Sequence, residues 1–152
     1  MVATLDVKFR VNNSGLNEVK KACKILNKKL QVGYFSNAFV VEKAYDNEFG
    51  SYEKDIPERG FMRHAANFYG KNILEDSATS LGLGEFTLEN AKYVVSLLGK
   101  NMKNAIQDSI DTVSSWSIYP HNSPTTIEYK GFDRPLYFTG EMRNSIEIRE
   151  GK

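Results

Sequence analysis

The chain has 152 residues, of which 41% are hydrophobic and 26% are charged, and this ordinary globular composition excludes disorder throughout. Its 20 Lys and Arg residues nearly balance its 19 Asp and Glu residues, so the formal net charge of +1 argues against a dedicated nucleic-acid-binding protein. The sequence lacks an apolar run of the roughly 20 residues that a membrane-spanning helix needs. No membrane association is therefore expected.

A single cysteine, Cys23, rules out a disulfide within the chain and a thiolate metal cluster. It lies among apolar residues at helical spacing and is predicted to be a small buried hydrophobic residue. The N-terminal sequence MVATLDVKFR alternates between apolar and polar residues, unlike a secretory signal. The protein is therefore expected to be soluble and made in the cytoplasm.

The first predicted elements are a strand, a helix and a second short strand. Apolar residues alternate with polar ones over 5–11, which predicts a strand with one buried face, and the polar run 12–15 ends it. Apolar residues at spacings of three and four then predict an amphipathic helix over about 15–30. A short strand is predicted at 32–35.

The predicted helix over 15–30 has a basic face. Its lysines are Lys20, Lys21, Lys24 and Lys28. We interpret this face as an ordinary solvated surface because the net charge of the chain is balanced, with a DNA-binding patch as the alternative.

The middle of the chain is predicted to be helical, with an exposed excursion. A short helix over about 38–44 leads to the sequence at 47–50, and the charged, proline-containing run 51–59 is expected to be exposed. A helix is predicted to begin at Phe61, and the glycine-containing sequence at 80–86 is expected to break it. That sequence lacks the preceding strand and third glycine of a phosphate-binding turn, so a hinge is the preferred interpretation.

A long amphipathic helix is predicted over 87–114, with Thr87 as its N-terminal cap. About 27 residues would give a rod of about 40 Å. We favour a core helix that crosses the sheet over a helix that protrudes onto a neighbouring subunit.

The last part of the chain is predicted to be irregular at first, with short strands. A strand is expected at 126–129, Thr139 is expected to cap a turn at 140–143, and alternation over 146–149 predicts a C-terminal strand. The order of elements predicts an α+β fold: a small mixed, mostly antiparallel sheet flanked by helices. Residues 1–152 are expected to form a single domain with exposed loops near 50–60 and 117–140.

The sequence offers little support for catalysis. His64 and His121 are the only histidines, and neither has a second ligand at metal-binding spacing. The carboxylates at 53–58 lie in a run with basic residues, which is typical of a solvated loop. No catalytic, metal or cofactor site is expected, and the chain is not predicted to be an enzyme. Aromatic residues in the irregular stretches indicate either interface contacts or caps on the edges of the core.

Two stretches of the sequence share a pattern with known proteins. The first is AYDNEFG at 44–50 with IPERGFMR at 56–63. The second joins LLG at 97–99 and IQDSI at 106–110 to NSPTTIEYK at 122–130, PL at 135–136 and TGEMRNSI at 139–146. In order and spacing they resemble the phage neck and tail-completion proteins, which include the virion morphogenesis and minor tail component families. Gly60 departs from the proline usual there, and Tyr137-Phe138 replaces a more common Ile/Val-Asp pair.

The resemblance implies a structural subunit of a ring in the neck of a tailed-phage virion, assembled in the host cytoplasm. Its implied partners are copies of itself, a head-closure or portal-side connector protein, and a tail terminator or tail-tube protein. Genomic DNA would pass through the channel of the ring. Alternatives are a tail terminator, a head-closure ring protein or, more remotely, a DNA-binding accessory factor that uses the basic helix face with Lys100 and Lys103.

The loop at 47–63 and the excursion at 117–140 are expected to make the assembly contacts. Glu48 and Arg59 are expected to form charge pairs and Phe61 to act as an apolar anchor, with a left-handed helix C-cap at Gly50 as the alternative role for the EFG sequence. The interface candidates are Glu48, Phe49, Gly50, Arg59, Phe61, Arg63, Tyr119, Lys130, Arg134, Tyr137 and Thr139.

Overall fold

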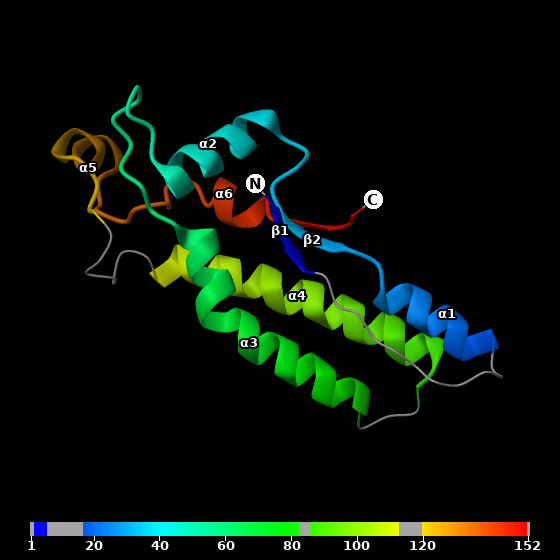
Figure 1. Ribbon diagram of the computed structural model, residues 1–152. Helices are drawn as coiled ribbons and strands as arrows, with labels where there is room; N and C mark the ends of the chain where they lie inside the picture. Colours follow the sequence, from blue (N-terminus) through cyan, green and yellow to red (C-terminus); the bar gives the residue numbers. More distant parts are fainter. Residues whose placement is uncertain (1, 6–16, 83–85, 113–119, 152) are drawn as a thin grey trace.

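The computed structural model describes residues 2–5, 17–82, 86–112 and 120–151 (Figure 1). In chain order its elements are β1 (Val2–Leu5), α1 (Asn17–Leu26), β2 (Leu30–Gly33), α2 (Ala38–Phe49), α3 (Phe61–Gly82), α4 (Leu88–Thr112), α5 (Pro124–Lys130), α6 (Glu141–Asn144) and β3 (Glu147–Glu150). The predicted α+β class is confirmed. Among these elements no helix is long and apolar enough to cross a membrane.

The sheet is antiparallel and has the strand order β1-β2-β3. The central strand, β2, pairs with β1 through Leu5 and Leu30 and with β3 through Val32 and Ile148. Strands from near the two ends of the chain therefore flank the central strand, and the C-terminal strand is where the alternation predicts it. The first strand lies at Val2–Leu5 and shares only Leu5 with the strand predicted over 5–11. Residues 6–11, like the predicted turn at 12–15, lie outside the described residues.

The long helix α4 is the backbone of the domain. It packs against β2, β3, α3 and α1, and its first turn is capped as predicted, because the hydroxyl of Thr87 accepts a hydrogen bond from Asn90 N–H at 3.2 Å. Gly99 lies where α4 comes closest to the sheet, since a Cβ there would be 2.9 Å from Ile148 Cγ2. The preferred core-helix interpretation is consistent with this packing.

The elements at the two ends of α4 are different. Figure 1 shows α1 packed at one end, and α2, α5 and α6 gathered at the other. At the α1 end a small apolar cluster includes Leu26, Leu81 and Val94, whereas the larger cluster joins β2 to α2, α3 and α4. The two ends of α4 are therefore covered by different elements and different apolar clusters.

Several predicted boundaries are wrong. α1 ends at Leu26, Leu30 belongs to the central strand, and α2 continues to Phe49. By contrast, α3 ends at Gly82, inside the sequence at 80–86 that is predicted to break it. The predicted strand at 126–129 is helix α5. Ser123 caps this helix by accepting a hydrogen bond from Thr126 N–H, and Gly131 ends it in the left-handed conformation at φ 78° and ψ 3°. With proline also in its first turn, these local signals outweigh the strand preference of Thr and Ile.

His64 links α3 to α4 and should make stability depend on pH. Its Nδ1 lies 3.2 Å from the hydroxyl of the buried Ser109, and its ring stacks on Phe68 at 5.3 Å. Burial lowers the pKa of His64, so the unfolded chain takes up this proton more readily than the folded protein. The stability that the neutral ring contributes is fully present above pH about 6.5 and is lost as the pH falls through the lower, folded pKa. Melting temperatures between pH 7.5 and 5.5 should therefore fall less steeply for His64→Gln than for the wild type; equal slopes would contradict this role.

Candidate functional site

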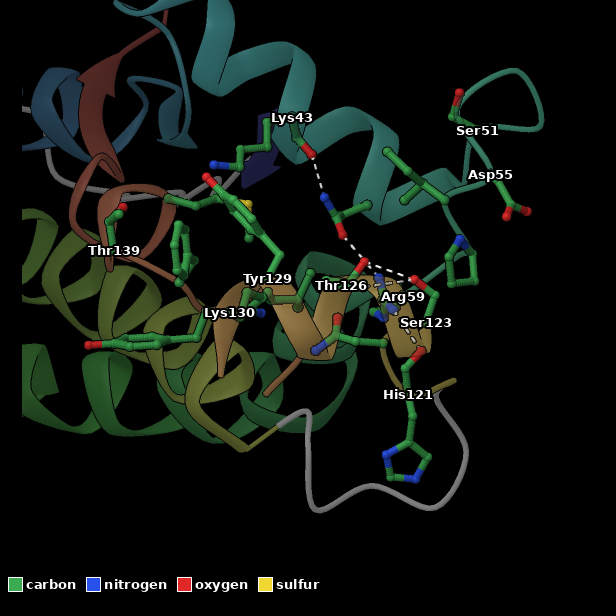
Figure 2. Close-up of a pocket in the computed structure, with 18 of the residues that line it drawn as sticks. Lys43, Ser51, Asp55, Arg59, His121, Ser123, Thr126, Tyr129, Lys130 and Thr139 are labelled. Atoms are coloured by element: carbon green, nitrogen blue, oxygen red, sulfur yellow. Dashed lines mark hydrogen bonds between the residues drawn. The ribbon is translucent and has the colours of Figure 1, made fainter. Parts of the chain in front are cut away.

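A pocket of about 660 Å³ lies at the end of the domain that is remote from α1. One side is formed by α2 and the 51–59 loop, and the other by α5 and the segment 131–142 (Figure 2). These are the two parts of the chain that the sequence marks as exposed excursions. Although more than 60 residues separate their starts in the sequence, they form the walls of one groove, which we call the α2–α5 groove.

Glu48 fastens the first turn of α3 to the end of α2. Its side chain is completely buried, and its carboxylate accepts hydrogen bonds from Met62 N–H at 2.8 Å and from Arg63 N–H and Nε at 3.0 Å. A negative charge is favourable there because the first turn of a helix has free N–H groups and a positive dipole end. The charge pair expected of Glu48 at an assembly contact is therefore made within the chain instead, with Arg63 as the cation.

Gly50 allows the chain to leave α2 and turn into the 51–59 loop. Its φ of 78° and ψ of 160° differ from the expected left-handed cap, and this region of backbone space is essentially open to glycine alone. A Cβ there would lie 3.1 Å from Glu58 N and 3.2 Å from the Ile56 carbonyl. The predicted excursion is thus a tight turn, closed by two backbone hydrogen bonds between Ser51 and Ile56 at 2.8 and 2.9 Å.

Arg59 ties the two walls of the groove together. It is only 5% exposed, and its guanidinium donates to Asn47 Oδ1 at 3.2 Å and to the carbonyls of Pro120 and His121 at 3.1 Å each. Burial lowers the pKa of Arg59, while the charge of Asp133 raises it. The guanidinium remains protonated at any physiological pH, so a permanent positive charge lies under the groove.

The start of α5 is held by Asp133. One carboxylate oxygen accepts from the backbone and side-chain amides of Asn122 at 3.1 and 3.0 Å, and the other lies 2.8 Å from Nδ1 of His121. These bonds, led by the backbone amide of Asn122, lower the pKa of Asp133. The His121 side chain is exposed and points away from the groove in Figure 2. We interpret the Asp133–His121 contact as structural: it holds the loop before α5 in place. The nearby hydroxyl of Ser123 is engaged by Thr126 in the first turn of α5.

Lys130 contributes a second positive charge to the groove. Its Nζ donates to the Arg134 carbonyl at 2.7 Å and lies 5.2 Å from the centre of the Phe132 ring. Burial lowers the pKa of Lys130, and the charge of Arg59 lowers it further. Across the groove, Lys43 is 3.8 Å from the carboxylate of Glu141. The charges of Arg59 and Lys130 repel each other, and this repulsion is why Arg59 lowers the pKa of Lys130.

Exposed aromatic side chains edge the groove. Tyr52 is fully exposed, Tyr129 is 78% exposed and Phe138 is 45% exposed. The rings of Tyr129 and Phe138 lie 5.6 Å apart, and Phe132 lies 6.5 Å from Phe138. Aromatic side chains in this setting are typical of protein interfaces.

The interface candidates divide into three groups. Glu48, Arg59 and Phe61 are buried within the chain, so the expectation that they contact a partner is wrong for this conformation. Phe61 packs in the main core, with its ring centre 6.4 Å from that of Tyr34. Tyr119 lies outside the described residues.

The remaining candidates reach the surface to different extents. Phe49 and Thr139 are exposed, Arg63 is half-exposed, and Gly50, Lys130, Arg134 and Tyr137 are partly buried. Thr139 accepts a hydrogen bond from Glu141 N–H at 3.3 Å, in agreement with its predicted capping role. Arg134 lies over the Tyr137 ring and pairs with Asp111 at 3.0 Å.

Other residues of the groove escape prediction from the sequence. Lys43 and Asn47 lie on a helix whose orientation is fixed only by packing, and the sequence marks Phe138 only as a departure from the resembling pattern. Tyr129 is one of the aromatic residues that the sequence marks as possible interface contacts, although its predicted strand is helix α5. No group of three or more His, Cys, Asp or Glu side chains suited to a metal ion occurs in the described part of the chain.

Comparisons with protein-family models, curated proteins and solved structures find no match to this chain.

Proposed function

We propose that the chain is a structural subunit of a ring in the neck of a tailed-phage particle, where it completes the tail or joins the head to the tail. The observation that supports this most is the convergence of the two resembling stretches. Ala44–Arg63 and the residues from Asn122 to Met142 are far apart in the sequence but build opposite walls of the α2–α5 groove. If proteins that share this sequence pattern assemble through one surface, the residues of the pattern are expected to come together on that surface.

The two ends of the domain also suit a ring. A closed ring requires that one surface of each subunit contacts a different surface of the next subunit. The helix α5, which lines the groove, and the lysine-bearing α1 lie at opposite ends of α4 (Figure 1). The near-neutral net charge of +1 suits a wall that DNA slides past without being held.

Electron microscopy of a phage with this gene deleted tests the proposal. A neck subunit predicts DNA-filled heads and tails of normal length that are not joined to each other. Tails of irregular length would instead identify a tail terminator, and fully assembled particles would contradict any role in the neck.

The lysines of α1 support a second candidate, a DNA-binding accessory factor. Lys20, Lys21 and Lys24 are exposed, whereas Lys28 lies beyond the end of α1 and is paired with Glu150 at 2.6 Å. Such a factor would bind duplex DNA with an affinity that falls steeply with salt. A mobility-shift assay with the purified chain at about 50 mM salt separates the two functions, since the neck subunit should give no shift.

A further inference from the structure

Among the described residues that line the α2–α5 groove, Arg59 and Lys130 are two cations without an ion pair of their own, whereas Lys43 is paired with Glu141. Within the described residues, neither Arg59 nor Lys130 forms an ion pair with a carboxylate, and their hydrogen bonds go to neutral oxygens of the chain. Asp133 is near both, but its oxygens are used by His121 and Asn122. A cation removed from water without a counter-charge is unfavourable, so these two positions favour an incoming anion.

Other cations of the domain show the contrast. Lys54, Arg63, Arg134, Arg143 and Arg149 each pair with a carboxylate at 3.0 Å or less. Lysines such as those on α1 are exposed and solvated by water. Arg59 is buried and Lys130 partly buried, and both line the pocket, so water solvates them less fully.

The groove also offers apolar surface beside these charges. Its lining includes Tyr129 and Phe138 at the edge of α5, and Leu136 and Met142 below them. Tyr129 loses little conformational freedom when it is covered, and its exposed ring presents a large apolar area. A small inorganic anion would leave this surface in water, whereas a peptide segment would cover both the charges and the rings.

We infer that the α2–α5 groove receives an extended segment of a partner protein, in which an Asp or Glu carboxylate meets Lys130 above the buried charge of Arg59. A neighbouring aromatic or aliphatic side chain of that segment packs on Tyr129 and Phe138. This inference rests on the proposed role of the groove as an assembly surface, and it names the chemistry of the partner. The charge of Lys130, added to that of Arg59, requires an acidic residue in the partner. The rings of Tyr129 and Phe138 require an apolar one.

A selection from a random library of displayed 12-residue peptides, with the purified full chain as the target, tests this inference. The enriched peptides should share an Asp or Glu next to an apolar residue. A synthetic copy of one of them, measured by fluorescence anisotropy, should bind Lys130→Gln about tenfold more weakly than the wild type. Lys100→Gln removes the same charge from an exposed site on α4 and should bind the peptide as the wild type does.

The inference is overturned if no peptide is enriched, if the enriched peptides lack an acidic residue, or if Lys130→Gln binds them unchanged. It is also overturned if the chain associates with itself through the groove and the peptides match its own sequence, because the occupant is then a second copy. The deletion phenotype is independent of these results. A normal neck after deletion would reject the proposed function, whereas a neck defect with no acidic preference would reject only the partner chemistry.

Discussion

Replacing Glu48 with alanine is expected to lower the free energy of unfolding by about 2–4 kcal/mol. The substitution removes the acceptor of Met62 N–H and of two donors on Arg63 at the first turn of α3. The Met62 amide is buried, so water cannot replace the lost carboxylate without opening the packing between α2 and α3. Urea unfolding, followed by circular dichroism, measures the change.

Glu58→Ala is the matched control, because Glu58 pairs with the same Arg63 from an exposed position. Its loss should cost less than about 1 kcal/mol. Glu48→Gln keeps one acceptor oxygen but not the charge, and its stability should lie between those of the wild type and Glu48→Ala. Equal losses for Glu48→Ala and Glu58→Ala would contradict a buried structural role for Glu48.

Arg59→Ala is expected to loosen the groove and to lower the free energy of unfolding by about 2–3 kcal/mol. The guanidinium is the link from Asn47, on α2, to the carbonyls of Pro120 and His121 at the start of the α5 wall. Without it those carbonyls lose their charged donor, and the segment 120–139 should exchange its amide hydrogens faster than in the wild type. Hydrogen exchange followed by mass spectrometry locates the effect.

Arg149→Ala is the control for Arg59→Ala. Like Arg59, Arg149 makes contacts within the chain, but it lies on the exposed strand β3. There it pairs with Glu147 and lies over the Phe35 ring. Its removal should cost less than about 1 kcal/mol and leave exchange in 120–139 unchanged. Unchanged exchange in that segment after Arg59→Ala would mean that Arg59 does not hold the two walls together.

Local features of the structure were largely predictable from the sequence. The periodicity of α4 spans many turns and Thr87 precedes it, so the helix and its cap could both be read from neighbouring residues. Alternation also predicts the C-terminal strand, whereas β1 shares only Leu5 with the N-terminal strand that alternation predicts. By contrast, the strand predicted at 126–129 rests on the β-branched residues there. The Ser123-Pro124 sequence that starts α5 and the Gly131 that ends it are local signals that indicate a helix instead.

The candidate site was less predictable because its key contacts are long-range. Charged residues are almost never fully buried unless they are paired, so the sequence predicts that the acidic residue before Phe49 and Gly50 lies at the surface. The burial of Glu48 depends on a helix start 14 residues later. Similarly, Arg59 meets backbone carbonyls more than 60 residues away. Periodicity reflects neighbouring residues, so it does not indicate contacts between residues that are far apart in the sequence.

These contacts change which residues should be altered to test assembly. Arg59→Ala and Phe61→Ala would disturb the fold as well as the surface, so tailless particles from either variant would not distinguish a lost contact from a lost structure. Tyr129 and Phe138 are exposed on the groove and can be changed at small cost to stability. Their rings also offer the large apolar area expected of a docking surface.

Complementation of the deleted phage with the Tyr129→Ser/Phe138→Ser variant tests the assembly role of the groove. The matched control is Phe39→Ser/Tyr93→Ser, which removes two exposed rings outside the pocket lining, from α2 and α4. If the groove is an assembly surface in the neck, the first variant should be folded and soluble but should yield DNA-filled heads without tails. The control should restore tailed particles. Normal plaque titres and tailed particles from the Tyr129→Ser/Phe138→Ser variant would contradict the proposal that this groove joins the neck.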